Sequence, residues 1–237
     1  MPVLRSSDEI LDSVRAAERR GLCAVPDRRK AWDNVWALET IETARVARDA
    51  PVADLGCRSG ILLTWLHQLG YRRLYGCDLQ RPLPPLRSAL VRRHAATAFH
   101  GAAMYVRNRR RMRVAPVERT GFPSGAFGTV ASMSVVEHGV DTPRFFAEAA
   151  RLLRAGGVLV VSTDYWPEEV ETRDLRRFAG LHGRDRVFAR PDVERLVEEA
   201  AAAGLELEGD LDLDVETPVI EEEGLRYTFL ALAWRRR

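Results

Sequence analysis

Two acidic side chains end apolar runs that have the character of buried strands. Asp54 closes the run in "VADLGCRSG" and precedes two glycines, Gly56 and Gly60, whereas Asp78 closes the run in "RLYGCDL". A strand that turns through glycines into a helix is typical of a loop that holds a cofactor. The glycines here are spaced G-x-x-x-G, which lacks the third glycine of a dinucleotide-binding loop. No Lys-Ser/Thr pair follows, so a P-loop is excluded.

The acid before the glycines indicates which cofactor fits. A carboxylate at Asp54 would face a diphosphate with about two negative charges, which is unfavourable in a partly buried site. A ligand with an ammonium, a carboxylate and a ribose fits better, because Asp54 can lie near the ammonium and Asp78 can accept from both ribose hydroxyls. These features indicate S-adenosylmethionine. The contacts predicted from the two strand ends are Asp54, Gly56, Cys57, Arg58, Gly60, Asp78 and Leu79.

The elements that must position these residues alternate between strand and helix patterns from Pro51 onward. Such alternation predicts a mostly parallel sheet with helices on both faces. Strands are expected over 52–56, 73–79, 113–118, 128–136 and 158–163, and helices over 61–70, 84–107, 142–157 and 191–204. Two final strands, over 206–217 and 225–234, are expected to form an antiparallel pair at one edge, and Thr142 is expected to cap its helix.

The first part of the chain has helical periodicity instead. Residues 1–48 are expected to form an N-terminal helical cap and residues 49–237 the main domain. Trp32 and Trp36 are four residues apart and share a helix face. Lys30 and Asp33 lie beside them and could close over the cofactor, although a plainly packed helix is the alternative for the aromatic pair.

Further polar residues end the later strands, and a ligand of such a sheet lies outside the carboxyl ends of its strands. Glu137 and His138 follow the fourth strand, and Asp164 and Tyr165 follow the fifth. His138 is a candidate general base, since histidine titrates near neutral pH, or a wall of the acceptor pocket. The alternative is a packing role. The catalytic candidates are therefore His138, Glu137, Asp164 and Tyr165.

Several motifs, in order, resemble class I S-adenosylmethionine-dependent methyltransferases. "VADLGCRSG" looks like their motif I and "LYGCDL" like their acidic motif II. "FPSGAFGTVASMSVVEHGVDTPRFFAEAARLLRAGGVLVVSTDYW" is similar to their run from the fourth to the fifth strand, in the type that acts on small molecules. The resemblance covers roughly residues 51–166.

This resemblance implies a Rossmann-like doubly wound sheet of seven strands in the order 3-2-1-4-5-7-6, mostly parallel with a reversed last strand. It also implies methyl transfer to oxygen or nitrogen of a small-molecule acceptor. Ser134, in the fourth-strand motif, is expected among the cofactor contacts.

The sequence departs from the family pattern at three positions. Arg58 replaces the middle glycine of motif I, and Gly128 replaces an acid before the fourth strand. Pro116 stands where the family often has an acid that binds the adenine amino group, which leaves the Val117 N–H and the Glu118 carboxylate as candidates. These departures favour one alternative, a degenerate fold that binds without catalysis. A nicotinamide-dependent oxidoreductase is the other.

Composition limits the remaining classes. The formal net charge is +2, so no strong attraction to nucleic acid or membranes is expected. Three cysteines without metal-type spacing suit a reduced, cytoplasmic protein. No metal site is expected, and the protein is expected to be a monomer or homodimer with a small-molecule partner.

Overall fold

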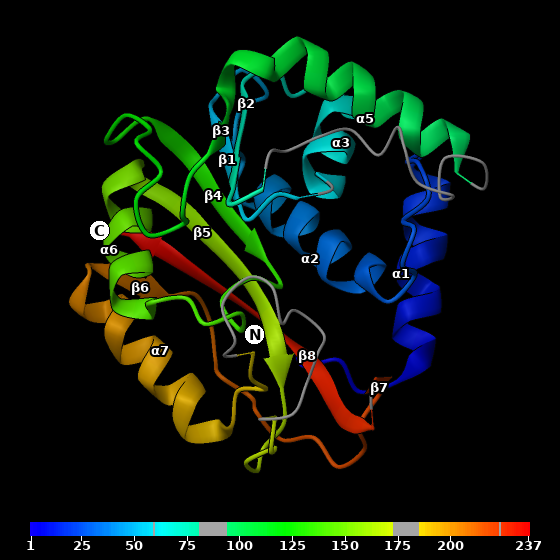
Figure 1. The fold of residues 1–237 in the computed structure, drawn as a ribbon, viewed down its shortest axis with the longest axis vertical. Helices are drawn as coiled ribbons and strands as arrows, with labels where there is room; N and C mark the ends of the chain where they lie inside the picture. The colour runs from blue at the N-terminus through cyan, green and yellow to red at the C-terminus, as the bar shows by residue number, and fades with distance from the viewer. Residues whose placement is uncertain (59, 81–93, 173–184, 223) are drawn as a thin grey trace.

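A central sheet organises the molecule. The computed structural model describes residues 1–58, 60–80, 94–172, 185–222 and 224–237. The strand order is β3-β2-β1-β4-β5-β8-β6 (Figure 1). Strands β1 to β5 are mutually parallel, and β8 runs antiparallel to both β5 and β6. The strands are β1 Val52–Leu55, β2 Leu74–Asp78, β3 Met112–Val114, β4 Phe127–Met133, β5 Leu153–Tyr165, β6 Leu205–Leu207, β7 Ile220–Glu222 and β8 Leu225–Arg236.

This topology confirms the predicted Rossmann-like fold, with β8 as the reversed strand that lies between β5 and β6. Seven strands follow the predicted order 3-2-1-4-5-7-6, and the short strand β7, which lies off this path, pairs with β8 as an eighth. The expected strand over 206–217 was also too long, since β6 ends at Leu207.

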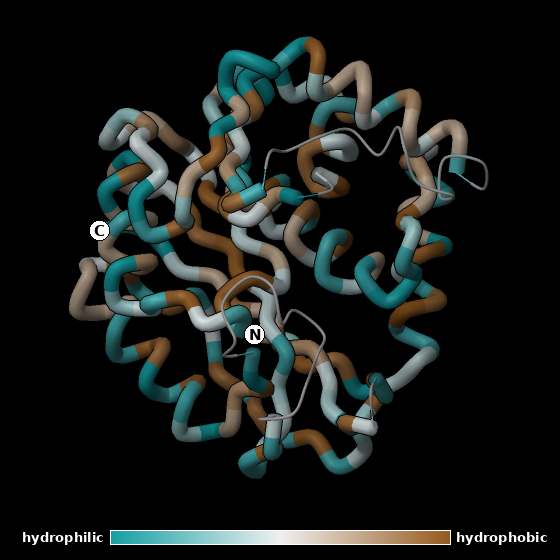
Figure 2. The backbone as a smooth tube through the Cα atoms, viewed as in Figure 1, coloured by the Kyte–Doolittle hydropathy of each residue, from teal (hydrophilic) through white to brown (hydrophobic). Residues whose placement is uncertain are grey.

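Helices cover both faces of the sheet, as predicted. Helices α2 and α3 pack on one face, and α6 and α7 pack on the other (Figure 1). Hydrophobic residues concentrate along the strands between these layers (Figure 2). The helices are α1 Ser7–Arg19, α2 Lys30–Thr43, α3 Ile61–Gln68, α5 Ala95–Asn108, α6 Thr142–Leu152 and α7 Arg190–Ala202, with the 3-10 turn η1 Arg109–Arg111. Residues 84–93 of the helix expected over 84–107 lie outside the described residues.

Helix α6 shows how local sequence sets an element. Pro143 occupies its first turn, where a missing N–H costs nothing. Its cap is Asp141, whose side chain accepts from the Arg144 N–H at 3.1 Å, so the prediction of Thr142 as the cap was wrong. Phe145 and Phe146 lie on its buried face and fix α6 against the sheet.

Helix α2 is part of the layer over the sheet. Its residues Val35, Leu38 and Ile41 share one hydrophobic core with Leu66 of α3 and Val160 of β5. Burial of such side chains contributes about 1.5–3 kcal/mol each. The helix is therefore held firmly above the strands whose carboxyl ends carry the predicted site. The boundary at residues 48 and 49 stays a prediction.

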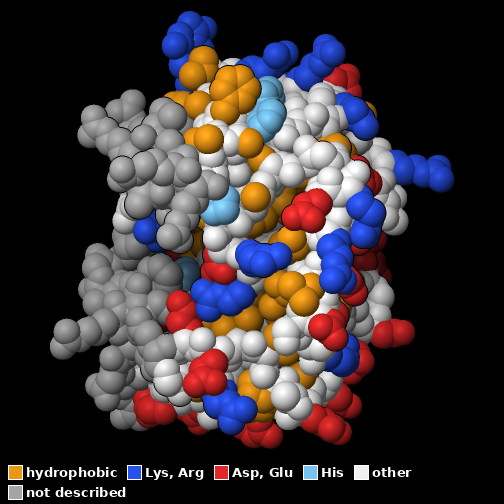
Figure 3. All heavy atoms as spheres, turned by 90° about the vertical axis from the view of Figure 1, so that its right-hand side faces the viewer, with side chains coloured by type: hydrophobic (Ala, Val, Ile, Leu, Met, Phe, Trp, Pro, Cys, Tyr) orange, Lys and Arg blue, Asp and Glu red, His pale blue; other side chains and the backbone are white. Residues whose placement is uncertain are grey.

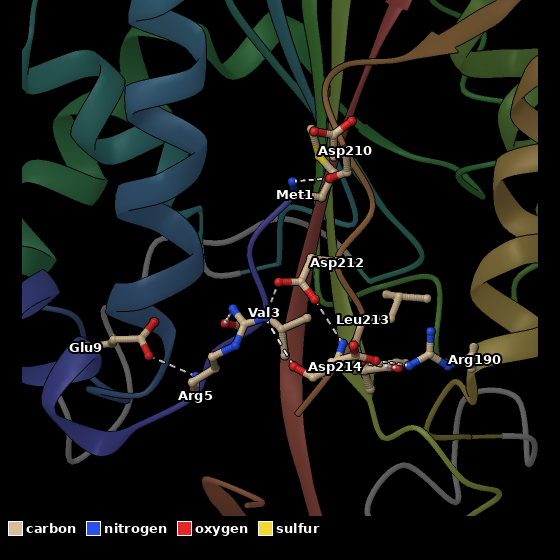
Figure 4. A network of polar contacts seen from close by, with 10 residues as sticks. Met1, Val3, Arg5, Glu9, Arg190, Asp210, Asp212, Leu213 and Asp214 are labelled. Atoms are coloured by element: carbon tan, nitrogen blue, oxygen red, sulfur yellow. Dashed lines mark hydrogen bonds and ion pairs between the residues drawn. The ribbon is translucent and has the colours of Figure 1, made fainter. Parts of the chain in front are cut away.

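The first residues of the chain pair with β8, which the helical expectation for 1–48 missed. The Leu4 N–H donates to the Phe229 carbonyl at 2.9 Å, and the Ala231 N–H donates to the Pro2 carbonyl at 3.0 Å. Arg5 then binds the Asp212 carboxylate at 2.7 Å (Figure 4). This N-terminal segment, residues 1–5, thus fastens β8 from one side.

The side of the molecule that carries α1 and α5 exposes apolar side chains near α5. Hydrophobic side chains gather at the upper end of this face (Figure 3). Phe99 and Val106 are 70% and 64% exposed. No helix in the described part of the chain combines the length and apolar character that crossing a membrane requires.

Candidate active site

The loop after β1 packs closely against the turn after β4. Gly56 has φ +82°, and a Cβ placed there would lie 2.4 Å from the Val135 side chain. Only glycine meets both conditions without strain. The Gly56 and Cys57 N–H groups donate to the Cys77 carbonyl at 2.8 and 3.0 Å. These two N–H groups of predicted cofactor contacts therefore already have a partner within the protein.

Asp78 ends β2 and receives backbone N–H groups from two loops. One carboxylate oxygen accepts from the Arg58 N–H at 3.0 Å, and the other accepts from the Gln80 N–H at 2.9 Å. A carboxylate offers about four acceptor positions, so about two stay available for ribose hydroxyls. The Arg58 residue itself is exposed, and Leu79 beside Asp78 is 42% exposed.

Asp54 is an ionisable side chain inside the protein, only 4% exposed at the end of β1. Burial raises the pKa of its carboxyl to about 7, and the negative charges of Asp78 and Asp33 add to this rise. A positive charge placed beside Asp54 would favour the ionised form. The three acids Asp33, Asp54 and Asp78, which we term the acidic cluster, form a region that suits a cationic ligand.

The third member of the acidic cluster comes from α2. Asp33 is fully buried, and one of its carboxylate oxygens accepts from the Ser162 hydroxyl at 2.9 Å and from the Ser134 hydroxyl at 3.3 Å. Lys30, one turn earlier, donates from Nζ to Ser134 Oγ at 2.6 Å. The only available signal was the three-residue spacing of Lys30 and Asp33, which places them on one helix face.

Ser134 lies at the centre of this network, directly after β4. Its φ is +52°, a left-handed conformation that costs a non-glycine residue of order 1–3 kcal/mol. Its N–H donates to Ser162 Oγ at 3.0 Å, and its hydroxyl bonds to Lys30 and Asp33. The network therefore holds a strained residue at the position predicted to contact the cofactor.

His138 and Glu137 contact Asp185 and Arg186, which the sequence did not indicate as individual site residues. The Nδ1 atom of His138 lies 3.1 Å from a carboxylate oxygen of Asp185, and both side chains are mostly buried. The Arg186 N–H donates to the Glu137 carbonyl at 3.0 Å. Glu137 is itself buried and accepts from the Thr163 hydroxyl at 3.3 Å. Asp185 thus lies in position to orient the His138 ring.

The two candidates at the end of β5 differ in their surroundings. Asp164 is buried, and its carbonyl accepts from the Phe188 N–H at 3.0 Å. Tyr165 is also fully buried, and its hydroxyl donates to the Leu213 carbonyl at 2.8 Å. Burial raises the pKa of Tyr165 to about 12. Tyr165 packs in the core with its hydroxyl bonded within the protein, and the catalytic role predicted for it stays a prediction.

Glu118, in the region after β3, forms a hydrogen bond within the protein. Its carboxylate accepts from the Asp141 N–H at 3.1 Å, which ties it to the cap of α6. Val117 is buried and Pro116 is exposed. The adenine contacts predicted for Val117 and Glu118 stay predictions. The family resemblance also implies acceptor contacts from residues 84–110, residues 166–188 and the N-terminal helical cap. Of these, residues 84–93 and 173–184 lie outside the described residues.

The described residues include no group of three or more His, Cys, Asp or Glu side chains placed to hold a metal ion. All three cysteines are free and buried. Burial raises the pKa of Cys77 to about 12 and that of Cys57 well above its ordinary value, so neither thiol is a ready nucleophile.

Comparison with known proteins finds a family model that matches the central part of the chain. Residues 53–161 match the family model described as "Methyltransferase domain". None of the curated proteins compared with the chain matches it.

Solved structures share the fold at low sequence identity. A geranyl diphosphate C-methyltransferase from Streptomyces coelicolor A3(2), in complex with S-adenosyl-L-homocysteine, is 18% identical with a TM-score of 0.56, over 97% of this chain and 98% of that one. The [4+2]-cyclase SpnF is 14% identical with a TM-score of 0.60, over 96% and 93%.

A Haemonchus contortus phosphoethanolamine N-methyltransferase 2, in complex with S-adenosyl-L-methionine, is 16% identical with a TM-score of 0.50. The match covers 73% of this chain and only 37% of that enzyme.

Proposed function

Because residues 53–161 match a methyltransferase-domain model and the fold is that of a methyltransferase solved with S-adenosyl-L-homocysteine, we propose that the protein transfers a methyl group from S-adenosylmethionine to oxygen or nitrogen of a small molecule. The acidic cluster is the observation that carries the proposal. Asp54, held at a pKa of about 7 by burial and by neighbouring negative charge, suits an ammonium-bearing cofactor and opposes a diphosphate. That charge argument also disfavours a nicotinamide dinucleotide.

The residues present fit the cofactor through their donor and acceptor sets. When bound, the cofactor supplies a methyl group already activated on a sulfonium, so alignment and exclusion of water are the main tasks of the protein. In this proposal Asp54 neutralises the ammonium, Asp78 accepts from the ribose, and the loop Gly56–Gly60 with Ser134 shapes the site between them.

We assign His138 the role of base for an acceptor that must lose a proton. Its Nδ1 faces the Asp185 carboxylate at 3.1 Å, which favours one orientation of the ring and supports a positive charge on it. His138→Ala is expected to lower turnover by about 10²–10⁴-fold. Full turnover in this variant would remove the role of base and leave His138 as a packing residue.

Calorimetry with S-adenosylhomocysteine tests the cofactor site. Binding is expected for the native protein and a loss of at least about tenfold, or 1.4 kcal/mol, for Asp54→Asn. Asp12→Asn, at an exposed residue of α1, is the matched control. Absence of binding to the native protein would favour a non-catalytic fold, and fluorescence titration with NADH would reveal a dinucleotide site.

Cofactor binding alone does not establish transfer, because a [4+2]-cyclase shares this fold. Incubation with labelled S-adenosylmethionine and a panel of small hydroxyl and amine acceptors tests the reaction by mass spectrometry. Formation of S-adenosylhomocysteine only when acceptor is present supports the proposal. The free cysteines support our proposal of a cytoplasmic location. The monomeric or homodimeric state and the lack of a nucleic-acid partner stay predictions.

A further inference from the structure

Lys30 is a cation at the site whose charge acts on the carboxyls of Asp27 and Asp33, although within the described residues it pairs directly with neither. It is the sole lysine of the sequence and the first residue of α2, where it is partly buried. Its Nζ atom donates to Ser134 Oγ at 2.6 Å and lies 4.0 Å from the centre of the Phe229 ring. Within the described ranges it has no ion pair, whereas the adjacent Arg29 pairs with Asp27 at 2.7 Å and Glu222 at 3.2 Å.

The Lys30 ammonium has more hydrogen-bond donors than its described partners use. A lysine side chain carries three N–H donors, and Ser134 accepts one of them. Asp33 is near enough for the charge of Lys30 to lower its pKa against the effect of burial, but the Ser134 hydroxyl lies between them in the hydrogen-bond chain. Within the part of the chain that the structure describes, two donors above an aromatic ring thus have no protein acceptor and can bind an acceptor atom of a ligand.

Lys30 lies apart from two of the predicted cofactor contacts, Asp54 and Asp78, although it donates to a third, Ser134. Asp54 and Asp78 lie at the ends of β1 and β2, whereas Phe229 belongs to β8 and pairs with Asp164 of β5. Neighbouring strands are about 4.8 Å apart, so β8 lies roughly 14 Å from β1 across the sheet. Lys30 therefore bridges the end of β4 and the region beyond β5, on the side away from the ribose site.

We propose that Lys30 binds an anionic group, a carboxylate or a phosphate, of the methyl acceptor, with the Phe229 ring beneath it. This proposal rests on the proposed function, because it assigns the cofactor to β1 and β2. It narrows the acceptor to a small anionic molecule. It also gives α2 a role in substrate selection. The helix contributes Asp33 to the acidic cluster and Lys30 to the binding of the acceptor.

The lone lysine provides a direct test. In protein labelled with ¹³C and ¹⁵N at lysine, the side chain of Lys30 gives the only lysine signal. Inorganic phosphate and diphosphate, titrated into protein saturated with S-adenosylhomocysteine, are expected to shift this signal saturably. Calorimetry is expected to show a loss of at least tenfold in diphosphate affinity for Lys30→Met and retained binding for Lys30→Arg.

A matched control separates a local site from a general effect of charge. Arg110→Met removes one positive charge from η1, before the start of β3 and so at the opposite end of the sheet. It should leave diphosphate affinity unchanged. No saturable shift of the Lys30 signal, or equal losses in Lys30→Met and Arg110→Met, would overturn the proposal.

The carboxylate of the cofactor is the competing source of the anion. If Lys30→Met weakens S-adenosylhomocysteine at least tenfold but leaves 5′-methylthioadenosine unaffected, the lysine binds the cofactor, and the assignment to the acceptor is wrong. Equal affinities of both nucleosides for native and variant protein support the acceptor. The titration also works without bound nucleoside, so a failure of the proposed function would be seen separately as absent S-adenosylhomocysteine binding.

Discussion

At the scale of single residues, Asp54 makes cofactor affinity depend on pH. In the free protein its carboxyl has a pKa of about 7, so it is largely protonated at pH 6. An ammonium beside it favours the carboxylate, and binding then releases a proton. S-adenosylhomocysteine affinity should therefore rise from pH 6 to pH 8.

Calorimetry in buffers of different ionisation enthalpy measures this proton release. 5′-Methylthioadenosine lacks the ammonium and is the ligand control, and Asp54→Asn is the protein control. An affinity that is flat with pH in the native protein, or the same slope in Asp54→Asn, would contradict the prediction.

Gly56 is a second residue at which a substitution is expected to have a large effect, here on the free energy of unfolding. Gly56→Ala places a methyl group 2.4 Å from Val135 at a φ of +82°. Left-handed backbone costs roughly 1–2 kcal/mol and overpacking about 1–3 kcal/mol, so the free energy of unfolding should fall by roughly 2–5 kcal/mol. Urea denaturation measures it. At Gly125, with φ +61° and open space around it, the same change should cost only the backbone part.

Arg58 illustrates the difference between a backbone and a side-chain role. Its N–H binds Asp78, while the residue is exposed. Arg58→Gly keeps that N–H, so S-adenosylhomocysteine affinity should change by less than about tenfold, or 1.4 kcal/mol. A larger loss in calorimetry would show that the guanidinium belongs to the site after all.

At the scale of elements, the N-terminal segment stabilises β8 and with it the floor of the proposed acceptor site. Leu4 is fully buried, and its N–H donates to the Phe229 carbonyl. Leu4→Ala should lower the free energy of unfolding by about 2–5 kcal/mol. Leu11→Ala, at a residue that is 39% exposed, should cost much less. Equal effects in urea denaturation would argue against a clamped segment.

Elements with strong local signals could be predicted from the sequence, and those held by distant contacts could not. The β-branched run in β5 and the amphipathic face of α6 are each visible in the local sequence, and both elements were predicted. The pairing of Val3 with Leu230 depends on residues more than two hundred positions apart, so no local pattern reveals it. The short strand β7 likewise exists only because β8 lies beside it.

The residues of the candidate site also fall into those that local sequence could predict and those that depend on distant contacts. Asp54 and Asp78 were recognisable because the ends of adjacent parallel strands must meet at one edge. Asp185 was not, since its place depends on how the segment at 185–189 packs across that edge. Asp33 was named beside Lys30, but its bond to Ser162 could not be predicted, because it depends on how α2 packs. The role of Tyr165 stays a prediction, and its burial could not be foreseen, because the sequence of a strand end does not show which face of the sheet the side chain takes.

At the scale of the whole molecule, the buried Asp54 affects stability as a function of pH. Its pKa is about 7 in the folded protein and 3.8 as its ordinary value. Between these values the folded state binds a proton that the unfolded state has lost, so the free energy of unfolding falls as pH rises from about 4 to 7. Three pKa units correspond to a loss on the order of 4 kcal/mol.

Asp54→Asn removes this titration. The variant should gain stability relative to the native protein as pH rises from 5 to 8, with the difference in thermal midpoint widening over that range. Asp12→Asn should show no such widening, because that side chain is 72% exposed. A constant difference between the Asp54 variant and the native protein would mean that Asp54 is already ionised when the cofactor is absent.

The place of β8 in the sheet has a consequence for biosynthesis. It follows every other strand of this sheet in the sequence, yet it inserts between β5 and β6 and also pairs with the N-terminal segment. A nascent chain that has emerged only to residue 224 has β5 with one open edge and Val3 and Leu4 without their partner strand. Such edges invite pairing with other chains. Strand β8 must therefore be synthesised before the N-terminal segment can dock against it. Chaperone binding should be strongest in the interval before β8 emerges.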